Sequence, residues 1–160
     1  KLEELKKKYT LGKVKFDSVI VADFDENLKS ITTSLSFTDV TSEDVKLITL
    51  NQWFDRSLFK ESSMEKIFFP SINFKKYNQF KEFYFENFGY FPYEISILSY
   101  DIMGLIYYAL KIQKDDIKKY VLNNKKEYIG EAGTFSFGNK KVDHKLNMYQ
   151  VSENKFIEVN

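Results

Sequence analysis

The sequence predicts an α/β fold in three layers, in which a parallel sheet is flanked by helices. Three observations lead to this prediction. Short apolar runs rich in β-branched residues alternate with helical patterns in the first half of the chain. A long segment near the middle carries almost no charge, which is typical of a helix buried inside a domain. After residue 126 short alternating segments are separated by glycines, which predicts a C-terminal β region that includes a hairpin.

The first strand is expected at residues 16–22 (FDSVIVA), where an apolar run lies between charged residues. A short amphipathic helix, residues 2–9, is expected before it. Asp25 is expected to cap the following helix, residues 26–37. The apolar face of that helix is formed by Leu28, Ile31 and Leu35.

Two more strands are expected at residues 45–50 (VKLITL) and 67–70 (IFFP), and Pro70 is expected to end the second of them. A short helix around residues 55–60 lies between these strands. Strands that alternate with helices in this way predict parallel pairing through right-handed crossovers.

An amphipathic helix is expected at residues 74–88, with Asn73 as its N-terminal cap. The spacing of its apolar residues predicts an aromatic face directed toward the core, made of Tyr77, Phe80, Phe83, Tyr84 and Phe88.

The chain is organised around the next helix, which follows a turn at residues 89–92 (GYFP). Asp101 is the only ionised residue between Ile95 and Leu110, so this helix is expected to be buried on most of its sides. Its length and its central aspartate do not suit a membrane span. Asp101 is predicted to be a structural carboxylate that caps another segment, rather than a general acid or base.

The last third of the chain begins with a Lys-rich helix at residues 115–123, which is expected to be a solvated face. Residues 134–137 are predicted to form a strand between two turns. Residues 146–151 and 156–159 are predicted to pair as a hairpin around Glu153 and Asn154.

Composition excludes several function classes. The 160 residues include 24 basic and 23 acidic side chains, a balance that gives no reason to expect nucleic acid or an anionic membrane as a partner. Arg56 is the one arginine, which further disfavours a phosphate-reading surface. Without cysteine there is no disulfide, thiolate metal site or cysteine nucleophile. His144 lies in a polar turn without a nearby nucleophile or second metal ligand, so it is expected at the surface. No GxSxG, P-loop or GxGxxG motif occurs, and neither an enzyme activity nor a cofactor is predicted.

Two strand ends carry the candidate binding residues. In open α/β sheets, ligands bind at the carboxyl ends of the strands. Asp23, Phe24 and Asp25 follow the first predicted strand, and Asn51, Gln52 and Trp53 follow the second. Each group places polar side chains beside an aromatic ring, a mixture that suits a small polar ligand.

Other interpretations of these residues remain open. Asp25 can be a helix cap and Trp53 a core residue, without any ligand. The acidic pair Asp23 and Asp25, with Glu26, lacks the glycine and distal glutamate of a calcium loop, so no metal site is predicted.

The order of the motifs resembles the C-terminal portion of a type I periplasmic binding protein, the group that includes the Leu/Ile/Val-binding solute receptors of ABC transporters. The resemblance extends over nearly the whole chain, and each motif is loose by itself while their order is fairly specific. The segments that carry it are FDSVIVADFDENL (16–28), VKLITLNQW (45–53), FGYFP (88–92), SYDIMGLIYYAL (99–110) and YIGEAGTFSF (128–137).

This resemblance implies two lobes that close on a ligand. Residues 1–67 and 127–160 would form the C-terminal lobe, and residues 68–126 would return to the N-terminal lobe. The hinge would lie near Phe69–Pro70 and near Lys126–Glu127. The N-terminal half of the family is absent from this sequence, so a missing N-terminal segment or a homodimer would cover the central helices.

The resemblance also implies a function. The chain would be a non-enzymatic periplasmic module that binds a small, amino-acid-like solute between its lobes for ABC-type uptake, with a membrane permease as its partner. A lipoprotein anchor, if present, would lie outside this sequence. The ligand-binding residues would be Asp23, Phe24, Asn51, Gln52 and Trp53.

Two of these positions correspond to family positions. Phe24 matches an aromatic residue that forms a wall of the ligand site. Asn51 stands where amino-acid-binding members have an acidic residue that holds the ligand's ammonium group. An amide is a weaker partner for a buried cation, and Asp23 could supply the charge instead.

A second functional interpretation comes from the same architecture. The segments ADF (22–24) and NQWFD (51–55) also resemble penicillin-binding-protein activators. In that case the chain would be an adaptor that regulates a cell-wall synthase through protein–protein contacts, and its cleft would not need a ligand.

Overall fold

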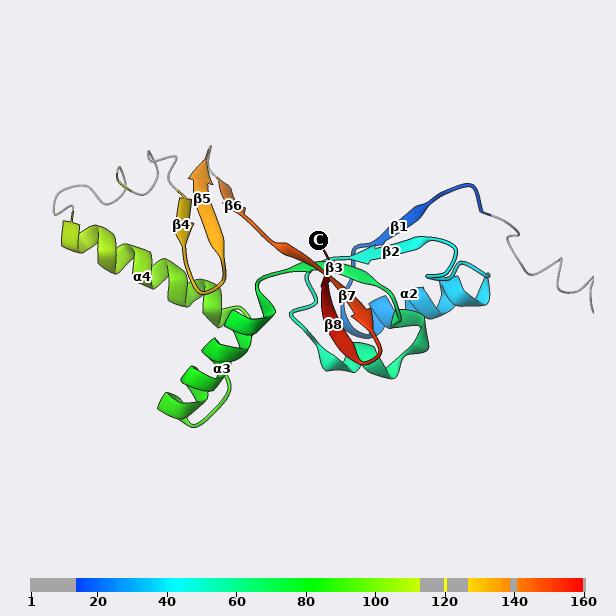
Figure 1. The fold of residues 1–160 in the computed structure, drawn as a ribbon, viewed down its shortest axis with the longest axis horizontal. Helices are drawn as coiled ribbons and strands as arrows, with labels where there is room; N and C mark the ends of the chain where they lie inside the picture. The colour runs from blue at the N-terminus through cyan, green and yellow to red at the C-terminus, as the bar shows by residue number, and fades with distance from the viewer. Residues whose placement is uncertain (1–13, 113–119, 121–126, 139–140, 160) are drawn as a thin grey trace, which may run out of the picture. The chain divides into compact units, whose positions relative to one another are not determined.

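The computed structural model describes residues 14–112, 120, 127–138 and 141–159 (Figure 1). The expected helix at residues 2–9 lies outside the described residues, as does the Lys-rich helix at 115–123 apart from Tyr120. The chain forms two compact units: unit 1 is Lys1–Ser71 with Asn147–Asn160, and unit 2 is Ile72–Leu146.

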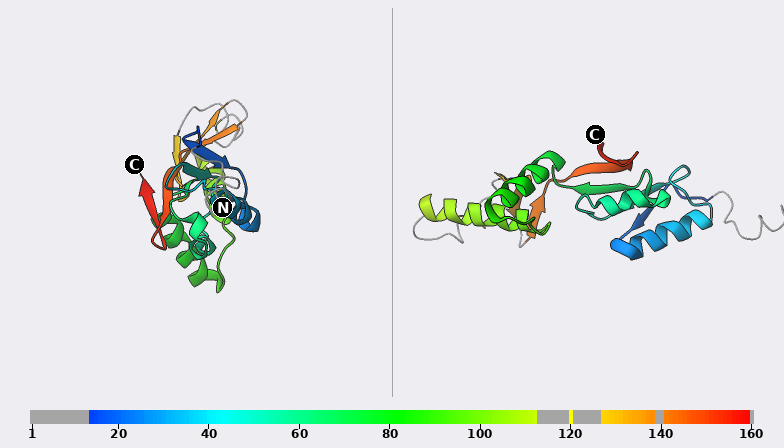
Figure 2. Two further views of the ribbon diagram at one scale, coloured as in Figure 1. Left: turned by 90° about the vertical axis from the view of Figure 1, so that its right-hand side faces the viewer. Right: turned by 90° about the horizontal axis from the view of Figure 1, so that it is seen from below.

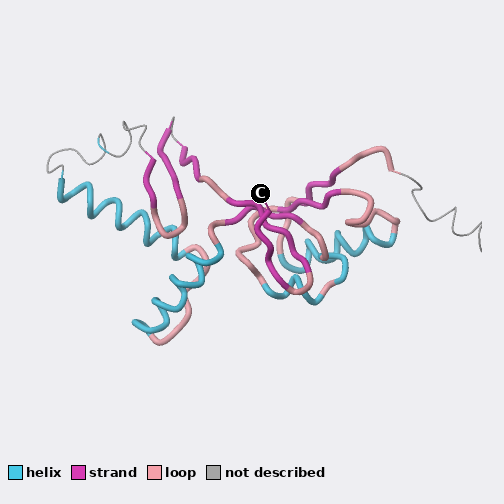
Figure 3. Tube along the Cα trace, in the orientation of Figure 1, coloured by secondary structure: helices cyan, strands magenta, loops and turns pink. Residues whose placement is uncertain are grey.

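Within its described residues, unit 1 contains a sheet in the order β1-β2-β3-β7-β8. Figure 3 draws the strands in magenta. β1, β2 and β3 are parallel, while β7 and β8 continue the sheet as an antiparallel hairpin. The predicted α/β class, the parallel strands and the C-terminal hairpin are therefore confirmed. The strands are β1 (Ser18–Val21), β2 (Lys46–Thr49), β3 (Phe68–Ser71), β7 (Asn147–Ser152) and β8 (Lys155–Val159).

Pro70 does not end its strand, which corrects one expectation. β3 continues through Pro70 to Ser71 and pairs there with β7. The register with β2 includes Phe68 but not Pro70, so the missing N–H of proline interrupts no pairing on that side. Phe69 and Ser71 are both completely buried, which gives the period-two pattern of a core strand.

The helical parts of unit 1 run beside the sheet: α2 (Asp25–Phe37) and two 3₁₀ turns, η1 (Arg56–Lys60) and η2 (Ser62–Met64) (Figure 2). The expected short helix at 55–60 is confirmed as η1, where Asp55 accepts a hydrogen bond from the Ser57 N–H at 2.8 Å. The expected cap of α2 is wrong, because Phe24 occupies the N-cap position without a side-chain bond and Asp25 already belongs to the helix.

Aromatic rings form much of the core of unit 1. The ring of Phe54 lies edge-on to Tyr149 at 4.9 Å, to Phe156 at 5.4 Å and to Phe69 at 5.8 Å between centroids. Phe59 contacts Phe156 at 4.6 Å, so η1 is attached to β8 through the same cluster. The segment that follows β2 is thereby fixed against β3, β7 and β8.

In its described part, unit 2 contains two helices and a three-stranded antiparallel sheet in the order β4-β5-β6. Only the central strand had been expected, because β4 and β6 are short and lie in polar sequence. The elements are α3 (Phe74–Phe88), α4 (Ser96–Ile112), β4 (Glu127–Ile129), β5 (Thr134–Gly138) and β6 (Lys141–His144).

α3 has the predicted bounds and the predicted cap. Asn73 accepts a hydrogen bond from the Lys76 N–H at 3.1 Å, and Gly89 ends the helix in the left-handed region with φ 77°. Tyr77 and Phe80 are buried as expected, and Tyr84 is half-buried. Phe83 and Phe88 are exposed, so the inward aromatic face is narrower than predicted.

α4 is less covered than its apolar sequence predicts. Its buried residues are Ile97, Leu105 and Ala109, which lie on one face. The expectation of burial on most sides is therefore wrong for the described chain. No helix among the described residues is long and apolar enough to span a bilayer. The large side chains left exposed on α4 are Tyr100, Met103, Tyr107, Tyr108, Leu110 and Ile112.

The boundaries of the two units differ from the lobe boundaries expected from the sequence. The chain passes from unit 1 to unit 2 after Ser71 and returns after Leu146, whereas crossings near residues 67 and 126 were expected. β4, β5 and β6 group with α3 and α4 because the β4–β5 turn is bonded to both helices. The assignment of each part to a lobe stays a prediction.

Candidate functional site

The predicted binding residues follow two neighbouring parallel strands. Val21, the last residue of β1, is in register with Thr49, the last residue of β2. The segments that carry Asp23 and Asn51 therefore leave the sheet at the same edge, as the sequence predicts.

Gln52 connects these two segments. Its side-chain Nε2 donates to the carbonyl of Asp23 at 3.1 Å and to Thr49 Oγ1 at 3.2 Å. Thr49 Oγ1 in turn donates to the carbonyl of Val21 at 2.8 Å. Gln52 and Thr49 are 6% and 2% exposed, so this network is shielded from water and holds the end of β1 against the end of β2.

Asp23 and Phe24 form the β1 side of the site. Asp23 Oδ1 accepts the Phe24 N–H at 2.8 Å, which fixes the carboxylate at the start of α2. Phe24 is 44% exposed, so its ring is available at the surface. The next residue, Asp25, has a φ of 50°, which is a strained value for a residue other than glycine.

Asn51 and Trp53 form the β2 side. Asn51 Oδ1 accepts the Trp53 N–H at 3.0 Å, and the Asp55 N–H donates to the carbonyl of Gln52 at 3.0 Å. Trp53 and Phe54 have φ values of 49° and 60°, both in the left-handed region. Packing of the Phe54 ring into the aromatic core offsets this strain, and Trp53 is half-buried.

The structure thus connects Asp23 with Gln52 and Asn51 with Trp53, while Phe24 adjoins Asp23. Sequence reasoning missed Thr49, whose buried hydroxyl connects both strands. A threonine that ends an apolar strand was the only available signal. Among the described residues, no group of three acidic or histidine side chains could hold a metal ion.

Asp101, in unit 2, has the structural role predicted for it. Its Oδ1 accepts the Glu131 N–H and its Oδ2 accepts the Ala132 N–H, both at 2.8 Å. The carboxylate therefore caps the turn between β4 and β5. Lys76 Nζ donates to the carbonyl of Gly130 at 3.0 Å, so α3 holds the same turn.

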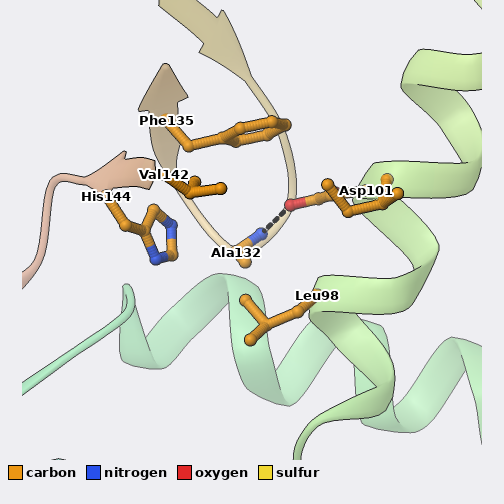
Figure 4. A pocket seen from close by; sticks show the side chains of 7 residues that line it. Leu98, Asp101, Ala132, Phe135, Val142 and His144 are labelled. Atoms are coloured by element: carbon orange, nitrogen blue, oxygen red, sulfur yellow. Dashed lines mark hydrogen bonds between the residues drawn. The ribbon is translucent and has the colours of Figure 1, made fainter. Parts of the chain in front are cut away.

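His144 corrects an expectation. It lies at the end of β6 rather than on an open surface, and its Nε2 atom is buried. Together with Leu98, Asp101 and Phe135 it lines a cavity of about 330 Å³ within unit 2 (Figure 4).

Comparison with known proteins gives matches in structure only. No protein-family profile and no curated protein matches the chain. The leucine-binding protein LivK of Thermotoga maritima matches with a TM-score of 0.60 and 14% identity over 90% of this chain and 44% of that protein. An ABC transporter substrate-binding protein of Desulfitobacterium hafniense, in complex with Leu, matches with a TM-score of 0.61 and 16% identity over 99% of this chain and 47% of that protein.

LpoA of Haemophilus influenzae also matches, with a TM-score of 0.55 and 14% identity over 89% of this chain and 26% of that protein. The chain spans less than half the length of these three structures. Similarity at this level of identity shows the fold, and the resemblance inferred from the motifs is confirmed at that level. The chain has the fold of the C-terminal portion of a type I periplasmic binding protein.

Proposed function

We propose that this chain is a non-enzymatic, extracytoplasmic ligand-binding module that binds a small, amino-acid-like solute for ABC-type uptake. The observation that carries this proposal is the joining of the β1 and β2 ends by Thr49 and Gln52, which brings Asp23 and Asn51 to one edge of the sheet. Solute-binding proteins with the same fold are known in complex with leucine, isoleucine or benzoate, and these ligands support the proposal.

Each predicted residue has a distinct role in this proposal. Asp23 faces the ligand's ammonium group, since a carboxylate is the stronger partner for a cation. Asn51 uses its Oδ1 on Trp53, so its amide nitrogen is the donor for the ligand's carboxylate. The rings of Phe24 and Trp53 enclose the apolar part of the ligand.

For Gln52 we propose a positioning role in place of the direct ligand contact that the sequence predicts. Its amide nitrogen donates to the Asp23 carbonyl and to Thr49 Oγ1 inside the protein. We therefore assign it to positioning Asp23 rather than to direct ligand contact. This proposal requires a membrane permease as the partner of the protein. It also requires that the protein is located in the periplasm.

Thermal denaturation of the full-length protein with leucine, isoleucine or benzoate tests the proposal. A ligand that binds only the folded state raises the melting temperature by mass action. Phe24→Ala and Asn51→Ala should abolish the rise. Phe37→Ala, on an 81% exposed ring of α2, and Asn87→Ala, on an exposed residue of α3, are matched controls that should retain it.

Asp23→Asn separates the two ligand classes. Leucine carries an ammonium group and benzoate does not, so this variant should lose the response to leucine and keep any response to benzoate. No shift with millimolar ligand in a folded protein, or a leucine response that Asp23→Asn leaves unchanged, would contradict the proposal.

A second candidate function is supported by the match to LpoA of Haemophilus influenzae. In this alternative the chain is a penicillin-binding-protein-activator-like adaptor that regulates cell-wall synthesis through its surface. Retention of the full-length protein on an immobilised cell-wall synthase, together with no response to any solute, would favour the adaptor. A solute response without such retention would exclude it.

A further inference from the structure

A small pocket of unit 2 is formed by α3, α4 and the β4–β5 turn, and it shares no residue with the proposed solute site. Its volume of about 240 Å³ lies somewhat below that of drug-sized pockets, so its ligand must be small. No basic side chain lines it. The lining consists of three aromatic rings, one carboxylate and one amide: Phe80, Phe83, Tyr100, Glu131 and Gln79.

The three rings form most of the wall of this pocket. Phe83 and Tyr100 are each 50% exposed, so a ligand can reach both rings from solvent. Phe80 is 5% exposed and supports Tyr100, with ring centroids 5.5 Å apart and ring planes inclined by 59°. Rings inclined in this way form a corner instead of a flat stack. The electron-rich faces of aromatic rings attract cations, and several rings together are a common way to hold a quaternary ammonium group.

The lysines of unit 2 are not placed over these rings. Lys81 Nζ lies over Tyr77 at 5.4 Å and over Phe91 at 5.5 Å, and Lys111 Nζ lies over Tyr107 at 5.8 Å from the ring centroid. Within the part of the chain that the structure describes, no lysine makes such a contact with a pocket ring. The pocket rings are therefore available to a cation from solution.

Glu131 adds a negative charge to the pocket. Its backbone N–H donates to Asp101 Oδ1 at 2.8 Å, and the carbonyl of Gly130 accepts a hydrogen bond from Lys76 Nζ at 3.0 Å. These bonds attach the turn to both helices. The carboxylate of Glu131 makes no ion pair with any described residue, and the ammonium of Lys76 is bound to the neighbouring carbonyl instead.

We propose that this pocket binds a small organic cation, with a methylated ammonium group against the three rings and Glu131 as its counter-charge. Methyl groups lower the cost of removing water from the cation, so more of its attraction to the rings is retained. An anion would be repelled by Glu131. This binding is independent of the solute site around Asp23 and Asn51.

Choline and 3,3-dimethyl-1-butanol are suitable probes, because they have the same shape and differ in that a carbon atom replaces the charged nitrogen. In isothermal titration calorimetry of the full-length protein, choline should bind saturably at millimolar concentration. The neutral isostere should bind about tenfold more weakly, because the rings and the carboxylate no longer attract a charge.

Substitutions separate the carboxylate from the rings. Glu131→Gln removes the charge and keeps the backbone bond to Asp101, so it should weaken choline binding about three- to fivefold and leave the isostere unaffected. Phe83→Leu removes a ring from an exposed position and should weaken choline binding to a similar degree. Glu86→Gln and Phe88→Leu, at exposed positions of α3 outside the pocket, are matched controls that should bind choline like the wild type.

Vesicles of phosphatidylcholine present the same ammonium group on a lipid. Cosedimentation that Glu131→Gln weakens would identify a lipid as the source of the cation. Binding of free choline without cosedimentation would identify a soluble cation.

Asp23→Asn distinguishes this proposal from the solute-binding function, because it should leave choline binding intact. Loss of choline binding in that variant would assign the cation to the solute site and overturn the proposal. The proposal is also overturned if choline gives no saturable heat with the folded protein, or if the neutral isostere binds as tightly as choline. Unchanged choline affinity in both Glu131→Gln and Phe83→Leu overturns it as well.

Discussion

Replacement of Gly130 by alanine should break the contact between α4 and the β4–β5 turn. A Cβ atom at this position would lie 2.2 Å from Asp101 Oδ2, 2.3 Å from Cγ and 2.6 Å from Oδ1. An ordinary contact needs about 3.4 Å, so the carboxylate or the turn must move by roughly 1 Å. Both hydrogen bonds that Asp101 accepts from the turn, now 2.8 Å long, would then exceed bonding distance.

The size of the loss follows from those two bonds. A hydrogen bond to a charged group contributes about 1.5–3 kcal/mol, and Ala132, at 1% exposure, has no water to replace its partner. If the turn and the carboxylate adjust and recover part of this stabilisation, the free energy of unfolding should fall by about 3 kcal/mol. Urea denaturation, followed by the circular dichroism of the helices, measures the change in global stability. Hydrogen exchange at the amides of residues 131 and 132 measures the local effect on the turn.

A matched control and a double-mutant cycle complete the test. Gly104→Ala lies within α4 with nothing within 4 Å of its new methyl group, so it should be neutral or stabilise by up to about 1 kcal/mol. Asp101→Ala removes the obstacle, so Gly130→Ala should cost much less in that background. A cost for Gly130→Ala below about 0.5 kcal/mol, or full additivity with Asp101→Ala, would refute the reasoning.

Three further predictions concern single side chains. Gln52→Glu should lower the free energy of unfolding by about 1–3 kcal/mol, because a carboxylate cannot donate to the Asp23 carbonyl; an unchanged urea midpoint would contradict it. Asn73→Ala should cost about 1 kcal/mol through loss of the acceptor for the Lys76 N–H, and Asn73→Asp, measured in the same denaturation series, should restore most of it. Burial, assisted by the charge of Glu94, raises the pKa of Tyr77 from 10.0 to about 12. The folded protein therefore retains this proton between pH 10 and 12 while the unfolded chain loses it, so the resulting stability is present below pH 10 and lost as the pH rises through about 12. Between pH 10 and 12, the Tyr77→Phe variant should lose less stability than the wild type. If the stability of the two proteins falls in parallel with pH, the raised pKa of Tyr77 is wrong.

Local patterns predicted the elements whose signals lie within a few residues. The bounds of α3 follow from Asn73 and Gly89, which satisfy the helix ends by themselves. The hairpin at Glu153 and Asn154 was equally clear, because the turn and its strands are adjacent in sequence. The meeting of Asp23 and Asn51 at one sheet edge could also be predicted, since parallel neighbouring strands end together.

Features that depend on distant residues could not be predicted. The role of Thr49 and the burial of His144 Nε2 depend on strand pairings that no local pattern specifies. β3 passes through Pro70 because β2 has already ended there, which is a property of its neighbour. The face of α4 that stays exposed could not be read from its own sequence, because an apolar residue indicates the need for a cover and not its source.

The pairing of Ser71 with Asn147 has a consequence for the modularity of the chain. The last residue of unit 1 before unit 2, and the first residue after it, are direct partners on antiparallel strands, so their Cα atoms are about 5 Å apart. Unit 2 is therefore a single continuous insertion into one potential β-hairpin. An Asn-Gly dipeptide could replace all of residues 72–146 and join β3 directly to β7 in a two-residue turn. The five described strands of unit 1, with the Gln52 network intact, would then form a minimal domain on which solute contacts could be measured without the rest of the chain.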